Sequence, residues 1–307
     1  MPARKGAQAS GATPVSLVCC GLIGTMVTDG GTVDRAFAEA IATQGVVTGT
    51  AAYARCMAQV HQHRGEPAAD VLAAMFPESQ ARGQAAHLAL DRSFCDAIGR
   101  MGATPVPGAV TALDKLADAG IRVCVVTSFS RRVLTLVLDT LGWADRVDLA
   151  LSPEDVPRGA PWPDLVLSAM LKLGVTDVRE AAVAHDTESG LLSGRRAGAG
   201  LAAGVLTGPH SSDRLRRAGA THLIPSIAHL PELLLVAGSP LAADPAASAS
   251  AASSASPAPA APAGGPPADG PAVVPPQSRP QGAPRAQDLS RERSRPPGRH
   301  TTGSFGG

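Results

Sequence analysis

The chain has 307 residues, of which 44% are hydrophobic and 17% are charged, so it can bury a sizeable core in one large domain or two small ones. Its 27 Lys and Arg residues against 26 Asp and Glu residues give a formal net charge of +1, which offers no electrostatic basis for binding nucleic acid. No apolar run reaches the roughly 18 residues that a membrane-spanning helix needs. Composition therefore excludes a membrane channel and a basic nucleic-acid binder, and we expect neither a membrane nor a nucleic acid among the partners.

The five cysteines are an odd number and include no CxxC pair, so we expect free thiols and not a disulfide framework. Residues 1–13 are mostly small or polar, and we predict a short disordered leader there. The apolar run that follows begins at Val15 and is too short and too late for a signal peptide. We therefore predict a cytoplasmic protein.

The chain changes in composition near its C-terminal end. Residues 239–307 hold 14 of the 27 prolines, interleaved with Ala, Ser and Gly, and a single aromatic residue. Such a segment cannot bury enough surface to offset the loss of chain entropy. We predict a disordered tail over 239–307, which either only solubilises the protein or contacts an acidic partner through its arginines.

Between these ends, apolar runs and helical patterns alternate along the chain. The first expected strand and the helices after it are Val15–Cys20, then Ala36–Thr43, Ala51–His61, Ala68–Met75, Ala85–Ile98 and Ala109–Ala119. The remaining elements, alternately strand and helix, are Arg122–Thr127, Arg131–Leu141, Val147–Leu151, Pro163–Leu173, Ala181–His185, Ser189–Ala197, Leu201–Leu206, Asp213–Ala218, His222–Ile224 and Ile227–Val236.

Strands that alternate with helices through short links predict an α/β fold with a parallel, Rossmann-like sheet. The all-helical block after the first strand is too long for one crossover, so it is expected to be an inserted cap domain. The predicted organisation is a leader over 1–13, an α/β core over 14–29 and 105–238, a helical cap over 30–104 and the tail. Ligands of such sheets bind at the carboxyl ends of the strands.

The stretches that follow the predicted strands carry the most specific motifs of the chain. They are Gly24-Thr25, Thr127-Ser128-Phe129-Ser130-Arg131, Leu141-Gly142-Trp143, Asp186-Thr187 and Gly194-Arg195-Arg196-Ala197-Gly198. In order and spacing they resemble the haloacid dehalogenase (HAD) superfamily, and within it the phosphonatase-like branch. The resemblance covers about 15–237 and implies a HAD-like core with a cap between the first and second motifs.

The resemblance also implies a chemistry. HAD enzymes transfer a phosphoryl or related group through a covalent aspartyl intermediate, with Mg²⁺ neutralising the anion. An Asp after the first strand is the nucleophile, and the residue two positions on is often the acid/base. A hydroxyl after the second strand holds phosphoryl oxygens, which implies phosphate binding by Thr127 and Ser128. A Lys or Arg in the third motif balances charge, and acidic residues of the fourth motif bind Mg²⁺, which implies Asp186 as a metal ligand.

The sequence departs from this pattern at the reacting positions. Alignment on Gly24-Thr25 puts Gly21 at the nucleophile position and Ile23 at the acid/base position, and Ala160 stands where the cation is expected. The second acidic position of the fourth motif is Gly190. One carboxylate, Asp186, would bind Mg²⁺ only weakly.

The cap departs from the family as well. The stretch Arg64-Gly65-Glu66-Pro67-Ala68 is similar to the cap motif of phosphonatase, with Ala68 where that enzyme has its Schiff-base lysine. No lysine occurs anywhere in 30–105. We therefore do not expect Schiff-base cleavage of phosphonoacetaldehyde.

Other residues have two interpretations each. His61, His63 and Asp186 could form a metal site if the cap closes on the sheet, or the histidines could simply pack or face solvent. Cys20 adjoins the nucleophile position but should face the core. Ser130, like Ser128, could bind a ligand or cap the next helix.

The sequence favours a pseudoenzyme: a HAD-like protein without catalytic residues that binds a phosphorylated small molecule, or a protein partner through the cap or the tail. The alternative is an active Mg²⁺-dependent hydrolase that uses Asp29, Asp186 or Glu188 as carboxylates, with Arg131 or Arg158 as the cation. In the first interpretation Asp29 is a turn residue.

Overall fold

The computed structural model describes residues 14–237. They form an α/β fold around a six-stranded sheet in the order β3-β2-β1-β4-β5-β6, in which all neighbouring strands pair in parallel. The strands are β1 (Leu17–Gly21), β2 (Arg122–Val126), β3 (Leu149–Leu151), β4 (Ala181–His185), β5 (Leu201–Val205) and β6 (His222–Ile224). The predicted fold class is confirmed, and the predicted leader and tail lie outside the described residues.

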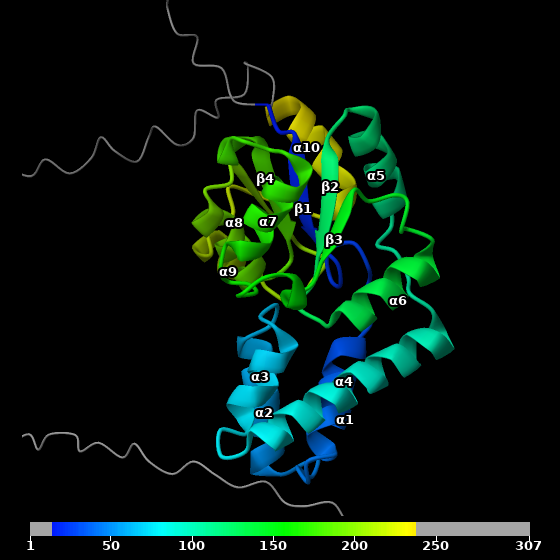
Figure 1. Cartoon of the computed structure of the whole chain (residues 1–307), viewed down its shortest axis with the longest axis vertical. Coiled ribbons are helices and arrows are strands. Elements are labelled where there is room, and N and C mark those ends of the chain that lie inside the picture. The colour runs from blue at the N-terminus through cyan, green and yellow to red at the C-terminus, as the bar shows by residue number, and fades with distance from the viewer. Residues whose placement is uncertain (1–13, 238–307) are drawn as a thin grey trace, which may run out of the picture. The chain divides into compact units, whose positions relative to one another are not determined.

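Helices cover both faces of this sheet (Figure 1). They are α5 (Ala109–Asp118), α6 (Arg131–Leu141), α7 (Asp164–Leu173), α8 (Glu188–Ala197), α9 (Ser212–Arg217) and α10 (Leu230–Ala237). Side chains of β1 alternate between two apolar clusters: Val18 and Cys20 pack on the side of α5, α6 and α10, and Leu17 and Cys19 on the side of α7 and α8. Cys20 therefore faces the core, as predicted.

Between β1 and β2, four helices precede α5. They are α1 (Thr32–Ala42), α2 (Ala51–Gln62), α3 (Ala68–Met75) and α4 (Gln80–Met101), and we call them the helical insert. The insert lies beyond the carboxyl ends of β1 and β2 (Figure 1). All the described residues belong to one compact unit, so the predicted domain boundaries at 30 and 105 stay a prediction.

Two helices of the insert begin earlier than the apolar pattern predicts, because polar residues fix their first turns. The predicted start of the first was Ala36, whereas α1 begins at Thr32, where Asp29 Oδ1 accepts a hydrogen bond from the Val33 amide at 2.9 Å. The fourth helix was expected from residue 85, whereas α4 begins at residue 80, behind an N-cap serine at 79. Apolar periodicity cannot detect such starts, because caps are polar.

The helical insert is in direct contact with the sheet's carboxyl edge. The Ala68 amide donates a hydrogen bond to the Ser128 carbonyl at 2.9 Å, and Ser189 Oγ donates to the Arg64 carbonyl at 2.9 Å. These contacts place the insert over the strand ends where a ligand is expected.

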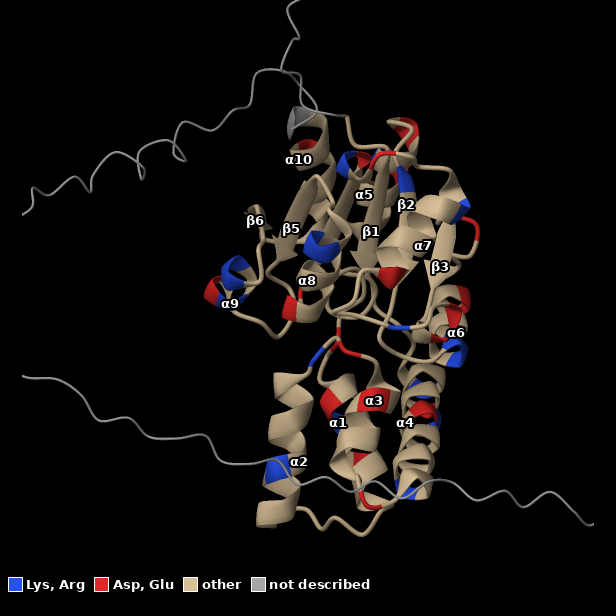
Figure 2. Cartoon of the chain, turned by 60° about the vertical axis from the view of Figure 1, so that its left-hand side comes forward, with Lys and Arg blue, Asp and Glu red and all other residues tan. Residues whose placement is uncertain are grey.

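Acidic and basic residues are mixed over the outer helices, and α4 and α9 carry both signs (Figure 2). This distribution agrees with the nearly neutral net charge. Within residues 14–237, no helix is long and apolar enough to cross a membrane.

Candidate active site

A small cavity of about 50 Å³ lies at the carboxyl ends of β1, β2 and β4. It is lined by the positions that the sequence singled out, Gly21, Ile23, Thr127, Ser128, Ala160 and Asp186, together with His185 and Gly190. Four motifs that are far apart in the sequence thus meet at one point, as a parallel sheet requires.

The hydroxyl residues after β2 hold the turn into α6. Thr127 is buried, and its Oγ1 accepts a hydrogen bond from the Phe129 amide at 3.2 Å, which leaves the hydroxyl proton free to donate into the cavity. Ser130 Oγ accepts from the Val133 amide at 3.3 Å and is the N-cap of α6. The capping role applies to Ser130, whereas Ser128 lines the cavity.

Asp186 is 2% exposed at the start of the loop after β4. Its Oδ1 accepts a 2.6 Å hydrogen bond from Thr25 Oγ1, and Thr25 Oγ1 in turn accepts from the Asp186 amide at 3.1 Å. Burial raises the pKa of Asp186 to about 6, although the hydrogen bond from Thr25 acts in the opposite direction. The backbones of Gly24 and Gly208 pack against its other carboxylate oxygen. Asp186 thus connects its own loop, after β4, to the two loops that contain these glycines.

The space beside Gly21, where the resemblance expects the nucleophile, is filled from the neighbouring strand. A Cβ at Gly21 would lie 2.8 Å from His185 Nδ1 and 2.8 Å from Thr25 Oγ1, closer than real Cβ contacts. β1 and β4 pair in parallel with Cys20 opposite Ala184, so His185 is the lateral neighbour of Gly21. The imidazole therefore takes the space into which a side chain at position 21 would extend.

The same imidazole fills a second position. A Cβ at Gly190, in the first turn of α8, would overlap the ring and Cβ of His185. The resemblance places acidic residues at both 21 and 190, and in this chain both are glycines around one histidine. Burial lowers the pKa of His185 to about 4, so near pH 7 the ring is neutral.

A second cavity, of about 40 Å³, lies between the first one and the helical insert. Arg64 lines it, but its guanidinium is bound to two carboxylates, Asp29 Oδ2 and Asp34 Oδ1, each at 2.5 Å. Asp29 also accepts from the Val33 amide in the first turn of α1, which agrees with the turn role that the first interpretation predicted. Arg64 and Asp29 therefore neutralise each other beside the cavity.

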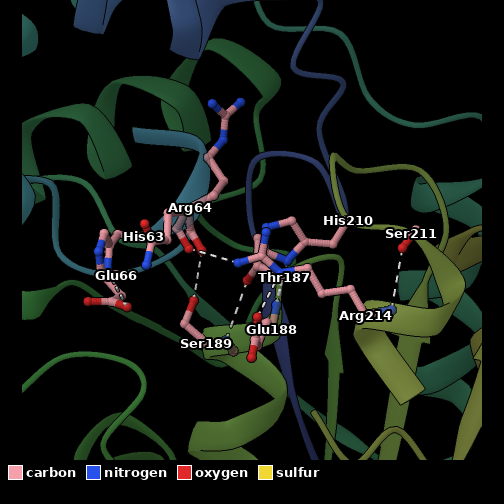
Figure 3. Close-up of polar contacts among 11 residues, drawn as sticks. His63, Arg64, Glu66, Thr187, Glu188, Ser189, His210, Ser211 and Arg214 are labelled. Carbon is pink, nitrogen blue, oxygen red and sulfur yellow. Dashed lines mark hydrogen bonds and ion pairs between the residues drawn. The ribbon is translucent and has the colours of Figure 1, made fainter. Parts of the chain in front are cut away.

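Glu188, the third candidate carboxylate, takes part in a polar cluster between the insert and the core (Figure 3). Its Oε2 accepts from Arg214 Nε at 2.7 Å, and Arg214 Nη2 donates to the Gln62 carbonyl of α2 at 2.7 Å. The Glu188 amide donates to His210 Nδ1 at 2.8 Å. This cluster connects α8 and α9 to the insert.

The candidate cations are also engaged elsewhere. Arg158 makes a two-point contact with Asp164, at 3.1 and 2.9 Å, and stacks on Trp162. Arg131 forms an ion pair with Asp155. Neither arginine lines the cavity around Ala160.

His63 and Asp186 line the same cavity of about 40 Å³, but the hydrogen bonds of His61 and His63 go to carboxylates of the insert. His61 Nε2 lies 3.1 Å from Asp34 Oδ2, and His63 Nδ1 lies 3.1 Å from Glu66 Oε1. Residues 14–237 contain no cluster of three or more His, Cys, Asp or Glu side chains placed to hold a metal ion. The side chain of His61 is exposed and that of His63 is half-buried, and both pair with insert carboxylates, which agrees with the interpretation that these histidines pack or face solvent.

His185 is the site residue that sequence reasoning missed. The sequence contains two signals for it. Glycines stand at two positions where the resemblance expects carboxylates, 21 and 190, and a large residue comes directly before Asp186. The parallel register of β1 with β4 places His185 beside Gly21, so its ring occupies space that a side chain at 21 or 190 would need.

The comparisons with known proteins concern the family and the fold. Residues 16–198 match the model of the haloacid dehalogenase-like hydrolase family. A phosphonoacetaldehyde hydrolase of Bordetella pertussis is 33% identical over 165 residues, which cover 45% of this chain and 59% of that protein. One of Pseudomonas fluorescens is 31% identical over 104 residues, 34% of this chain and 38% of that protein. The matched parts thus span less than two thirds of these curated relatives.

Solved structures show the same fold. A phosphonoacetaldehyde hydrolase-like protein from Oleispira antarctica matches with a TM-score of 0.64 and 21% identity, over 77% of this chain and 97% of that one. A hydrolase from Pseudomonas syringae matches with a TM-score of 0.61 and 23% identity, over 71% of this chain and 97% of that one.

Proposed function

Because the chain belongs to the haloacid dehalogenase-like hydrolase family, we propose that it is a member that keeps the fold and has lost the hydrolase chemistry. The observation that carries this proposal is the His185 imidazole in the space of the two expected carboxylates. The loss is then built into the packing of the pocket and is not a single substitution in an otherwise intact site.

The nucleophile and the acid/base are the first missing parts. Gly21 has no side chain, and Ile23 at the cavity wall cannot transfer a proton. Loss of one member of a catalytic set commonly lowers a rate by about 10⁴- to 10⁶-fold. The neutral His185 does not replace the nucleophile in this proposal, because it is held between two glycine backbones and attached to a buried strand end.

The residues present do not fit a resident Mg²⁺. A hard cation prefers several oxygen ligands, and the only carboxylate lining the 50 Å³ cavity, Asp186, already accepts from Thr25. The other two expected acidic positions are Gly21 and Gly190. We therefore propose no metal-dependent step for this protein.

The chemistry named for the curated relatives is not proposed for this chain. Schiff-base formation needs a lysine amine, and the matching position in α3 is Ala68. Of the two lysines within 14–237, Lys115 pairs with Glu232 at 2.7 Å on α5 and α10, and Lys172 is in the last turn of α7. Neither lysine lines the cavity.

We also propose that binding, and not turnover, is the remaining use of the pocket. Thr127 and Ser128 could hold oxygen atoms of a phosphorylated small molecule. The charge of the site acts against a phosphate dianion, because Ala160 supplies no cation and Arg64 is occupied by Asp29 and Asp34. Any such binding should therefore be weak, and a protein partner remains the other proposed ligand.

The test is a Mg²⁺-dependent hydrolysis assay of the full chain with p-nitrophenyl phosphate, phosphonoacetaldehyde and a panel of sugar phosphates. Asp186→Asn is the matched control, because it removes the one retained fourth-motif carboxylate. The proposal expects the two proteins to give the same background rate on every substrate. Turnover by the wild-type chain that Asp186→Asn abolishes would support the active-hydrolase alternative.

A further inference from the structure

The two segments that connect the helical insert to the core lie side by side. The Thr28 amide donates to the Thr104 carbonyl at 2.9 Å, and the Val106 amide donates to the Met26 carbonyl at 2.9 Å. The first segment contains Gly30, whose φ of +56° is a left-handed conformation that favours glycine. Any change in the angle between insert and core would bend these two segments.

A cavity of about 280 Å³, which we call the hinge cavity, lies against both segments. It is several times larger than the cavities of about 40 and 50 Å³ at the strand ends. Its apolar wall consists of Val27 and three α4 residues at helical spacing, Phe94, Ile98 and Met101. Met101 is 60% exposed, which is unusual for a large apolar side chain.

The polar side of the hinge cavity contains one unengaged charge. Arg35 on α1 forms none of the ion pairs found within residues 14–237. Its single side-chain hydrogen bond there, to Thr32 Oγ1, is long at 3.5 Å. Asp29 also lines the cavity, but its oxygens accept from the Val33 amide and from Arg64. The cavity therefore combines an apolar wall with one available guanidinium.

We propose that the hinge cavity is a binding site for a small monocarboxylic acid with an apolar tail. Arg35 would bind the carboxylate through two parallel hydrogen bonds, and Phe94, Ile98 and Met101 would cover the tail. A monoanion fits better than a phosphate dianion, because the cavity offers one cation with Asp29 nearby. The hinge cavity shares only Ile23 with the cavity of about 50 Å³, and Arg35 lines neither cavity at the strand ends, so the proposal does not rest on the proposed function.

Occupation of this site would also act on the hinge. The ligand would contact α1 through Arg35, α4 through Met101 and the connecting segment through Thr28. A ligand that touches all three favours the arrangement in which they have this spacing. Binding should therefore favour the arrangement of insert and core described here.

The experiment is a calorimetric titration of the full chain with hexanoate, with hexan-1-ol and acetate as probes that each lack one half of the expected ligand. Arg35→Gln removes the charge and keeps a polar side chain. Arg55→Gln is the matched control, because it removes an exposed cation of α2 that does not line the cavity. Ala103→Leu fills the cavity while Arg35 stays in place, and circular dichroism checks that each variant is folded.

The proposal expects saturable binding of hexanoate. Hexan-1-ol should bind at least about tenfold more weakly because it lacks the charged hydrogen-bond acceptor, and acetate should do so because it buries no apolar tail. Arg35→Gln should weaken hexanoate binding by about tenfold or more, and Arg55→Gln should leave it unchanged. Absence of saturable hexanoate binding to the wild-type chain overturns the proposal. Equal hexanoate affinity in wild type and Arg35→Gln overturns it as well.

Discussion

The imidazole of His185 lies against Gly21, so close that a Cβ at position 21 would be 2.8 Å from Nδ1. Gly21 ends β1 and His185 ends the neighbouring β4, so the two residues meet at the centre of the carboxyl edge of the sheet. A family site that is expected to hold charged carboxylates at this point holds a neutral ring instead.

This packing predicts that restoring the expected family residues while His185 stays in place will not restore hydrolysis. Gly21→Asp, even together with Ile23→Asp and Ala160→Lys, should give no hydrolysis, because the new carboxylate would collide with His185. Adding His185→Gly and Gly190→Asp removes the obstacle and supplies the second acidic residue. Activity of the three-residue variant in a phosphatase assay would show that the ring does not block the site.

The burial of His185 should make the free energy of unfolding depend on pH between pH 4 and 7. Burial lowers its pKa from 6.5 to about 4, so between these values the unfolded chain binds a proton that the folded chain does not. The stability contributed by the neutral ring is present above pH 6.5 and is lost as the pH falls towards 4, by about 3 kcal/mol in total. In His185→Gln, denaturant titrations should show a shallower acid loss; an unchanged slope would contradict this.

Titration of Asp186 should change the stability of the fold in the direction opposite to that of His185. Burial raises its pKa from 3.8 to about 6, so over that interval the folded chain binds a proton that the unfolded chain does not. Its protonated form stabilises the fold below pH 3.8, and that stability is lost as the pH rises through 6. Asp186→Asn removes this opposing effect, so its loss of stability from pH 6 to 4 should be steeper than that of wild type. A shallower loss would mean that the carboxyl is charged in the folded protein.

Mg²⁺ alone should not stabilise the protein. One hydrogen-bonded carboxylate makes a poor site for a hard cation, so millimolar Mg²⁺ should leave Tm unchanged in a thermal-shift experiment. Ca²⁺ at equal ionic strength is the control for general salt effects. A saturable rise of Tm that is specific to Mg²⁺ and absent in Asp186→Asn would contradict the donor set described above.

Arg214 should hold the helical insert against the core. Its guanidinium joins Glu188 of α8 to the Gln62 carbonyl of α2, so Arg214→Gln should cost about 1 kcal/mol of stability. Amide hydrogen exchange should rise at the C-terminal end of α2. Arg217→Gln on the same helix is the matched control, since Arg217 is exposed; equal exchange in both variants would exclude a specific contact by Arg214.

Much of the fold could be predicted because apolar runs, and glycines that end helices, are local signals in the sequence. β4, α3, α6 and β6 have the predicted bounds. The meeting of Gly21, Thr127 and Asp186 at one cavity also followed from the rule that strand ends share an edge. Those positions needed only the order of the elements along the chain.

The rest of the site depends on lateral contacts that no local pattern encodes. The fit of His185 between two glycines depends on the register of β1 with β4. The binding of Arg64 by Asp29 and Asp34 joins residues 35 and 30 positions apart. Both contacts determine the charge of the pocket, and predicting either one required the three-dimensional arrangement.

The most direct test of the account is a double-mutant cycle on stability with Gly21→Ala and His185→Ala, followed by urea denaturation. In wild type, Gly21→Ala should destabilise by about 1–3 kcal/mol through overpacking. With His185→Ala in place, the same change should cost less, by about 1 kcal/mol or more, because the contact with the ring is then gone and the contact with Thr25 Oγ1 remains. A coupling of about 1 kcal/mol or more is predicted, and additive effects would contradict the claim that His185 occupies the nucleophile's space.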